Sequence, residues 1–193
     1  MRFVVPILLT LVFSVFVLAI LGMTTFWVEW QKPDPQPIAY PHDFHAGSAI
    51  TTLSDGKVAA GLGLQCTHCH QYVDKSRFAT IPAVSICAEC HTKLPPRTDE
   101  LQKLKAYLDN NEPIVWQRIH SVPKHVYFSH KRHVKYYADE KGMEVGNGEI
   151  CAKCHGNMQV VKEVKQVTTL RMGFCVSCHR AENAPQDCWT CHK

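Results

Sequence analysis

The sequence predicts a small domain of short α-helices and irregular segments that follows one N-terminal transmembrane helix. Three observations lead to this fold class. The chain opens with a long apolar run, it places all ten of its cysteines in one recurring motif, and elsewhere it shows little sustained periodicity of the helical or the strand type. A chain of 193 residues with these features has few positions left for a conventional apolar core.

The apolar run covers residues 3–28, which contain no charged side chain and consist mainly of Val, Leu, Ile and Phe. As a helix, such a run crosses a hydrocarbon core of about 30 Å. A cleavable export signal has a shorter apolar region that ends in small residues, whereas this run ends near Trp27 and Trp30, which suit the membrane interface. We therefore expect an uncleaved anchor over residues 1–30. Arg2 indicates that the rest of the chain lies outside the cytoplasm.

A stiff spacer is expected over residues 31–37, because three prolines in this stretch disfavour a helix and favour an extended chain. The remaining sequence divides into a first repeat over residues 38–97, a linker helix over residues 98–113 and a second repeat over residues 114–193. A loop within the second repeat, residues 141–148, is indicated by its three glycines.

The linker helix is predicted from its ends and from one apolar face. Thr98 or Asp99 can cap its first turn, and Pro113 cannot continue it. Three leucines at helical spacing form the apolar stripe: Leu101, Leu104 and Leu108. We expect this helix to serve packing rather than chemistry.

The recurring motif is Cys-x-x-Cys-His. It occurs five times, numbered here motif 1 to motif 5 in chain order, at residues 66–70, 87–91, 151–155, 175–179 and 188–192. Zinc ribbons, redox pairs and disulfide frameworks share the cysteine spacing, but none of them requires a histidine directly after the second cysteine. The full motif is the attachment signature of c-type haem, in which two cysteines on one helical face form thioethers and the histidine binds the iron. The sequence therefore predicts five covalently bound haem c groups.

These motifs contain most of the residues of the predicted haem sites. The haem attachment residues are Cys66, Cys69, Cys87, Cys90, Cys151, Cys154, Cys175, Cys178, Cys188 and Cys191. The proximal iron ligands are His70, His91, His155, His179 and His192.

Two upstream histidine pairs are predicted to supply distal iron ligands, His42 with His45 and His130 with His133. Each pair lies two positions after an aromatic residue and upstream of two haem motifs. The order of histidine pair, haem and haem thus occurs twice, which indicates a duplicated unit, and motif 5 is an addition to the second copy.

The fifth distal ligand is left open by the sequence. His125 and His120 are the candidates, with Met172 as a thioether alternative that would raise the potential of its haem. We also expect the last haem to use an upstream histidine, His133 first. His68, between the two cysteines of motif 1, is expected to be a bystander.

Five haems in this chain leave roughly 26 residues for each, too few for a separate protein core around every cofactor. The haems are therefore expected to form the core themselves, stacked or edge to edge, with short helices at the motifs. The formal net charge is +4 at pH 7. Two propionates on each haem would change this to roughly −6, so a nucleic-acid-binding function is not indicated.

A paired-histidine segment followed by closely spaced haem motifs resembles the cytochrome c3/c7 class, which implies a multihaem cytochrome c of class III-like fold. More closely, the chain resembles the pentahaem cytochrome c subunit of alternative complex III. The similarity covers nearly the whole chain and is carried by the anchor, the five motifs and residues 36–40, 75–77, 81–82, 116–120, 125–128 and 172–180.

This resemblance implies an electron-transfer subunit, not a catalytic enzyme, in a respiratory complex of the bacterial inner (cytoplasmic) membrane. The anchor would cross once and the haem domain would lie on the periplasmic side. The implied partners are integral-membrane quinol-binding subunits, an iron-sulfur/molybdopterin-like subunit, and a monohaem cytochrome c or terminal oxidase as electron acceptor. The implied function is to relay electrons from quinol oxidation to that acceptor.

The residues leave two other functions to consider. One is a stand-alone anchored quinol dehydrogenase, or a related subunit of a quinone-reductase complex. The small tetrahaem anchors of that type often carry a Met two residues after the haem histidine, and no motif here has one. The other is a multihaem reductase enzyme, which needs an iron with an open coordination site. Against it, the spare histidines outnumber the haems and no Cys-x-x-Cys-Lys variant occurs.

Overall fold

The computed structural model describes residues 3–30, 34–48, 50–52, 56 and 58–192. The chain separates into two compact units, Met1–Pro35 and Gln36–Lys193. Parts of the expected anchor and spacer, residues 1–2 and 31–33, lie outside the described residues, and so does Lys193.

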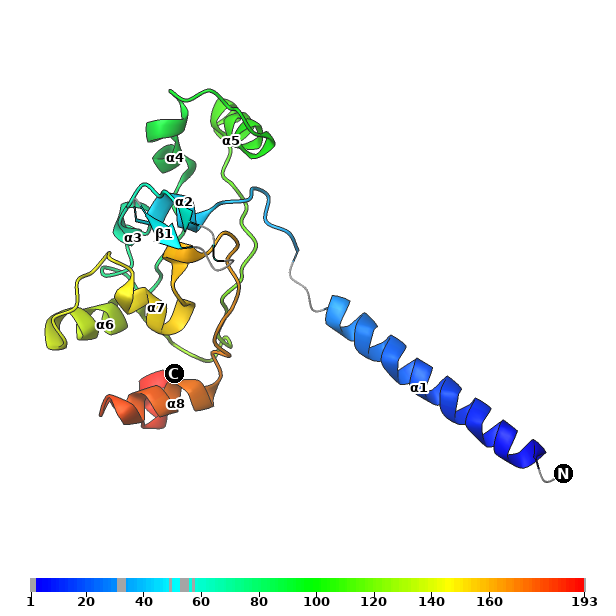
Figure 1. The fold of residues 1–193 in the computed structure, drawn as a ribbon. Coiled ribbons are helices and arrows are strands. Elements are labelled where there is room, and N and C mark those ends of the chain that lie inside the picture. The colour runs from blue at the N-terminus through cyan, green and yellow to red at the C-terminus, as the bar shows by residue number, and fades with distance from the viewer. Residues whose placement is uncertain (1–2, 31–33, 49, 53–55, 57, 193) are drawn as a thin grey trace. The chain divides into compact units, whose positions relative to one another are not determined.

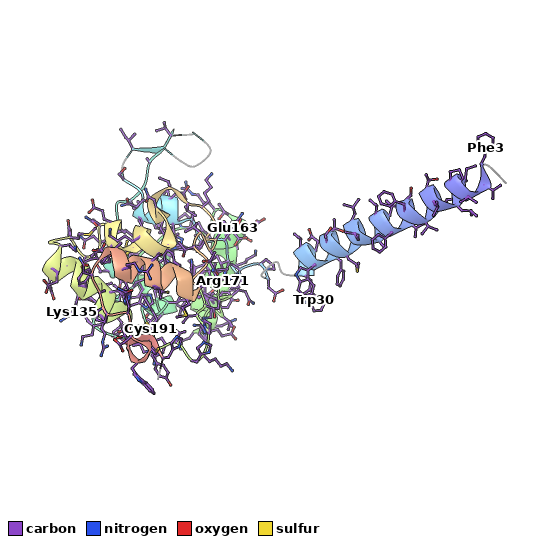
Figure 2. The ribbon with its side chains drawn as sticks, turned by 90° about the horizontal axis from the view of Figure 1, so that it is seen from below. Phe3, Trp30, Lys135, Glu163, Arg171 and Cys191 are labelled. Carbon is purple, nitrogen blue, oxygen red and sulfur yellow. The ribbon has the colours of Figure 1, made fainter. Side chains whose placement is uncertain are left out.

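The first unit is dominated by helix α1, Val4–Trp30, and none of its residues is buried within the unit. Figure 2 shows its side chains standing out on all sides between Phe3 and Trp30. A helix of 27 residues is roughly 40 Å long, more than the hydrocarbon thickness of a bilayer. By length and composition α1 can cross a membrane, as the apolar run predicts.

The second unit consists of short helices joined by irregular segments (Figure 1). Its α-helices are α2 His42–Ala46, α3 Cys66–Cys69, α4 Val84–His91, α5 Asp99–Asn110, α6 His130–Lys135, α7 Glu149–His155, α8 Met172–Ala181 and α9 Cys188–Cys191. A π-helical turn η1, Tyr136–Glu140, continues α6, and a 3₁₀ turn η2 spans Met158–Val160. All five haem motifs thus coincide with helices, which is the local geometry that places two cysteines on one face.

One short hairpin was not expected from the sequence. Strands β1, Thr51–Thr52, and β2, Val58–Ala59, pair antiparallel, with Thr51 opposite Ala59 and Thr52 opposite Val58. Two residues in each strand give no alternating pattern that could be read from the sequence.

Helix α5 lies where the capping signals indicate a helix. The Thr98 hydroxyl accepts a hydrogen bond from the Leu101 amide at 3.2 Å, so Thr98 and not Asp99 caps it. Asn111 ends the helix in the left-handed conformation, with φ of 52°. Leu104 is the buried residue of its apolar stripe, and α5 packs against α4.

The glycine-rich loop is packed, not free. Gly146 has φ of 117°, a conformation that favours glycine, and its carbonyl accepts the Cys66 amide at 2.9 Å. A Cβ at Gly146 would lie 3.0 Å from the Thr67 hydroxyl oxygen. The loop therefore joins the second repeat to motif 1 of the first.

The apolar core of the second unit is small. One cluster contains Val73, Val134, Tyr137 and Ile150, and no large side chain among the described residues is less than 2% exposed. A conventional domain of this size buries far more of its apolar surface. The described protein atoms alone thus form only a small core, and that haems fill the rest stays a prediction.

Candidate functional site

The two predicted distal pairs lie at equivalent places in the two repeats. His42 begins α2 and His130 begins α6, so each pair lies on one helical turn with its second histidine three residues on. In the first repeat the Tyr40 ring stacks on His45 with centroids 4.4 Å apart and meets His42 edge-on at 4.8 Å.

Phe128 repeats this arrangement in the second repeat. Its ring stacks on His133 at 4.4 Å and meets His130 edge-on at 4.9 Å. The same three-ring group therefore occurs twice, and in both copies the aromatic ring contacts both histidines. This geometry agrees with the duplication inferred from the order of the motifs.

Three of the predicted distal histidines face a proximal histidine across a gap that fits a metal ion. Because a metal to imidazole-nitrogen bond is about 2 Å long, two imidazoles bound on opposite sides of one metal have ring centroids roughly 6 Å apart. The observed pairs are His45 with His91 at 6.3 Å, His130 with His155 at 6.4 Å, and His133 with His179 at 6.0 Å.

His42, the fourth predicted distal ligand, lies near His70, the proximal histidine of motif 1. Burial, followed by the neighbouring His70, lowers the pKa of His42 to about 4. Burial also lowers the pKa of His155 to about 4, with further contributions from His120 and His130. These histidines are therefore neutral in the folded chain at pH 7, which is the form that binds metals.

Hydrogen bonds fix the ring orientation of six predicted ligands. In each, Nδ1 donates to a backbone carbonyl oxygen, which leaves Nε2 with a free lone pair for iron. The bonds are His45 to Pro41 at 2.9 Å, His70 to Thr80 at 2.9 Å, His130 to Arg77 at 3.2 Å, His133 to Ser129 at 2.8 Å, His179 to Pro185 at 2.6 Å and His192 to His125 at 3.3 Å.

Two buried ring nitrogens in the described part of the chain have no hydrogen-bond partner, Nδ1 of His42 and Nε2 of His120. An unpaired buried polar atom is costly and indicates a missing partner. Of these two atoms, Nε2 of His120 is the one that could bind an iron, whereas Nδ1 of His42 lacks the carbonyl acceptor that the other predicted ligands have.

The cysteines are available for attachment. All ten are free of disulfides. Within the described ranges, no three His, Cys, Asp or Glu side chains converge on a point where they could hold a metal ion. The cysteine pairs are therefore spread over separate helices, as thioether attachment requires, and not gathered as in a zinc ribbon.

The fifth distal ligand is not resolved by this arrangement. His125 and His192 have ring centroids 5.3 Å apart, closer than two ligands on opposite sides of one metal, and the His125 carbonyl accepts the His192 Nδ1. The carbonyl of His125 therefore lies on the Nδ1 side of the His192 ring, opposite the His192 Nε2 that would bind iron. In the structure His125 lies beside His192 instead of across an iron from it. His120 meets His155 edge-on at 4.4 Å, and Met172, at the start of α8, is 70% exposed.

The expectation that His133 serves motif 5 is not favoured by the distances. Its ring lies 6.0 Å from that of His179 of motif 4, so the geometry favours motif 4. Which haem His133 serves stays a prediction. His68 behaves as the predicted bystander would, since its Nε2 lies 3.8 Å from a Glu89 carboxylate oxygen in an exposed pair.

Arg77 is a structural residue of the site whose contacts no local sequence pattern predicts. Its guanidinium donates to the carbonyls of Phe128 at 3.0 Å and Val126 at 3.4 Å, and it lies over the Tyr127 ring at 4.5 Å. Its own carbonyl accepts both the backbone amide and the Nδ1 of His130. A loop of the first repeat thus holds the distal helix of the second.

Comparison with known proteins agrees with a haem site. No family model matches the chain. The chain is 26% identical over 177 residues to the multihaem cytochrome c subunit of menaquinone reductase from Nitratidesulfovibrio vulgaris, a match that covers 82% of this chain and 77% of that protein. This similarity supports a multihaem cytochrome c with covalently bound haem c, and an electron-transfer subunit instead of a catalytic enzyme. The number of five haems and the individual ligands stay predictions.

Proposed function

We propose that this chain is a membrane-anchored pentahaem cytochrome c that relays electrons in a quinone-linked oxidoreductase of the alternative complex III type. The observation that carries the proposal is the set of three histidine pairs at 6.0, 6.3 and 6.4 Å, each joining a proximal to a distal ligand. An iron held on both axial sides exchanges electrons but has no open position for a substrate.

Each bound haem would supply one iron that cycles between the ferrous and ferric states and so carries one electron. The chain supplies the rest. The cysteines fix the position of each porphyrin, the histidines close both axial positions, and the carbonyls that accept their Nδ1 protons set ring orientation and ligand basicity.

The electron balance assigns the remaining steps to partners. Oxidation of a quinol to a quinone releases two electrons and two protons, and we place this step in integral-membrane quinol-binding subunits. The chain would take the electrons one at a time and pass them to a one-electron acceptor, a periplasmic monohaem cytochrome c or a terminal oxidase. An iron-sulfur/molybdopterin-like subunit completes the proposed complex.

The proposed location follows from α1 and from the cofactor. Helix α1 would cross the bacterial inner membrane once. The second unit would lie on the periplasmic side, because c-type haem is attached outside the cytoplasm.

A second candidate is favoured by the name of the relative. That protein is a subunit of a menaquinone reductase, so the same relay would then deliver electrons to a quinone instead of collecting them from a quinol. A stand-alone quinol dehydrogenase is the third arrangement, in which the chain would work without the other subunits.

Purification from native membranes in mild detergent separates these candidates. The proposal predicts that the tagged chain co-purifies with the quinol-binding and iron-sulfur subunits, contains five haems by pyridine haemochrome assay, shows only low-spin ferric signals in EPR, and is reduced by added quinol. Isolation as a lone monomer with quinol dehydrogenase activity contradicts the complex. Turnover only in the direction of quinone reduction supports the second candidate, and a large high-spin ferric signal contradicts the relay.

A further inference from the structure

We propose that the five haem motifs form one line through the domain in the order 2, 1, 3, 4, 5, so that an electron path begins or ends at motif 2 and at motif 5. This order differs from the order in the sequence. The order of the motifs follows from contacts between them. Only the use of this line as an electron path rests on the proposed function.

Motif 2 adjoins motif 1 in three ways. Nε2 of His68, in motif 1, lies 3.8 Å from a carboxylate oxygen of Glu89, in motif 2. Tyr40 contacts both distal histidines, of which His45 faces motif 2 and His42 lies beside His70 of motif 1. The thiol of Cys87 also has Cys69 as a neighbour, which together with burial raises its pKa.

Motif 1 adjoins motif 3 across the boundary between the repeats. The Cys66 amide donates to the Gly146 carbonyl at 2.9 Å, two residues before the N-cap of α7, which carries motif 3. A Cβ on Gly148 would lie 3.8 Å from the Cys66 sulfur.

Motif 3 adjoins motif 4 through Tyr137. The Lys153 ammonium of motif 3 lies over the Tyr137 ring at 4.6 Å, and the Tyr137 hydroxyl lies 3.9 Å from the Cys178 sulfur of motif 4. Tyr137 is one of the few buried apolar residues, so this connection is held by the core cluster.

Motif 4 adjoins motif 5 through the short turn between them. His179 donates its Nδ1 proton to the Pro185 carbonyl at 2.6 Å, and the Ala184 amide donates to the His179 carbonyl at 2.8 Å. Motif 5 begins at Cys188, three residues after Pro185, so this turn keeps it beside motif 4.

The contacts leave one linear order. In the part of the chain that the structure describes, no hydrogen bond, ion pair or ring contact joins motif 2 to motif 3, 4 or 5, motif 1 to motif 4 or 5, or motif 3 to motif 5. Figure 1 shows α4, α3, α7 and α8 in this succession down the domain, with the C-terminus beside α8.

Both ends of this line reach the surface. Trp189, inside motif 5, is 76% exposed, and Leu94, three residues after motif 2, is 54% exposed. Each transfer along the line would move one electron, so that one site is oxidised as its neighbour is reduced and the domain gains or loses charge only at motifs 2 and 5.

A map of the holoprotein tests the order directly. Cryo-EM of the purified complex should show that the four shortest iron to iron separations join motifs 2 and 1, 1 and 3, 3 and 4, and 4 and 5. A map in which motif 2 lies closer to motif 3 than to motif 1, or in which motif 1 is an end of the line, overturns the proposal. If the line has this order but the chain does not co-purify with quinone-linked subunits, the proposed function fails and the order stands.

A variant at the junction gives a second test. Gly146→Ala in the holoprotein puts a Cβ 3.0 Å from the Thr67 hydroxyl, so it should push motif 1 away from motif 3. Gly142→Ala is the matched control, because Gly142 also has positive φ but has nothing within 4 Å of its Cβ position. We expect Gly146→Ala alone to change the spacing of midpoint potentials in a redox titration and to slow reduction of motif 5 after flash reduction at motif 2 several-fold. Wild-type titration and kinetics for Gly146→Ala would count against the junction.

Discussion

At the residue scale, the two aromatic rings that contact the distal histidines are the most informative side chains. Tyr40 and Phe128 occupy matching positions and hold two imidazoles each, one by stacking and one edge-on. Aromatic contacts of this kind contribute about 0.5–1.5 kcal/mol each. They therefore set how firmly each histidine is held against an iron.

Replacing Tyr40 with Leu should free His42 and His45 and shift the midpoint potentials of two haems in the first repeat by up to roughly 60 mV. The low-spin EPR signals of those two haems should broaden. Tyr40→Phe keeps the ring and should restore most of the wild-type titration. Phe128→Leu is the matched variant and should affect two haems of the second repeat; a titration unchanged by both Leu variants would argue against positioning by these rings.

Glu182 links pH to stability. The neighbouring Lys141, which forms a 3.0 Å ion pair with it, holds the pKa of Glu182 below its usual range, and Tyr136 and Tyr137 also donate to it. Because the folded pKa is depressed, this stabilisation is present above the ordinary glutamate pKa and is lost as pH falls through the lower folded value.

We therefore expect the guanidinium midpoint of the holoprotein, followed by far-UV circular dichroism, to fall below pH 4 partly through Glu182. Glu182→Gln should flatten that acid limb while lowering the midpoint at pH 7. Glu163→Gln is the control, since its pairing with Lys165 at 3.4 Å is exposed on both sides. Identical acid limbs in the wild type and Glu182→Gln would rule out this linkage.

At the element scale, the contact between the first-repeat loop and α6 is the main connection outside the motifs. The Arg77 guanidinium makes two hydrogen bonds to backbone carbonyls and packs on Tyr127. Because these carbonyls precede α6, they place its first residue, His130, against the Arg77 carbonyl.

Arg77→Ala should therefore destabilise the holoprotein by roughly 2 kcal/mol, the usual range for hydrogen bonds from a charged group. Arg77→Lys keeps the charge but not the forked geometry, so it should recover only part of the loss. Chemical denaturation, monitored by loss of the low-spin Soret band, measures the unfolding midpoint of both variants. An Arg77→Ala midpoint equal to that of the wild type would show that the connection carries little energy.

The sequence was sufficient for local features and insufficient for long-range ones. The cysteine spacing predicts helices at each motif, and Thr98 marks the start of α5, because both depend on residues within one helical turn. The pairing of His133 with motif 4 and the contacts of Arg77 and Tyr137 depend on residues far apart in the chain, and no local pattern records them. The strands β1 and β2 have two residues each, too few to show the alternation of apolar and polar residues that predicts a strand.

At the scale of the whole molecule, the protein atoms supply too little buried surface to hold the domain. Six apolar residues among those described are buried, and four of them form the single cluster around Tyr137. Stability must then come largely from the cofactors, as in small domains that fold only around a metal.

A chain with all ten cysteines replaced by alanine should accordingly fail to fold. After export and purification it should lack a cooperative thermal transition and be cleaved rapidly by trypsin within residues 38–192. Its helix α1, whose hydrogen bonds are all within the helix, should remain helical in detergent micelles and serves as the internal control. A cooperative transition in this variant would show that the polypeptide has a sufficient core of its own.

The interlocked repeats also constrain how the protein is made. The Asp43 amide donates to the Val161 carbonyl at 3.0 Å, and the Cys66 amide donates to the Gly146 carbonyl, so the first repeat is completed by residues that are synthesised much later. Until those residues have been made, motifs 1 and 2 have no surface to pack against. The enzymes that attach haem would therefore meet an open, accessible chain, and closure of the first repeat would follow only after the second has arrived.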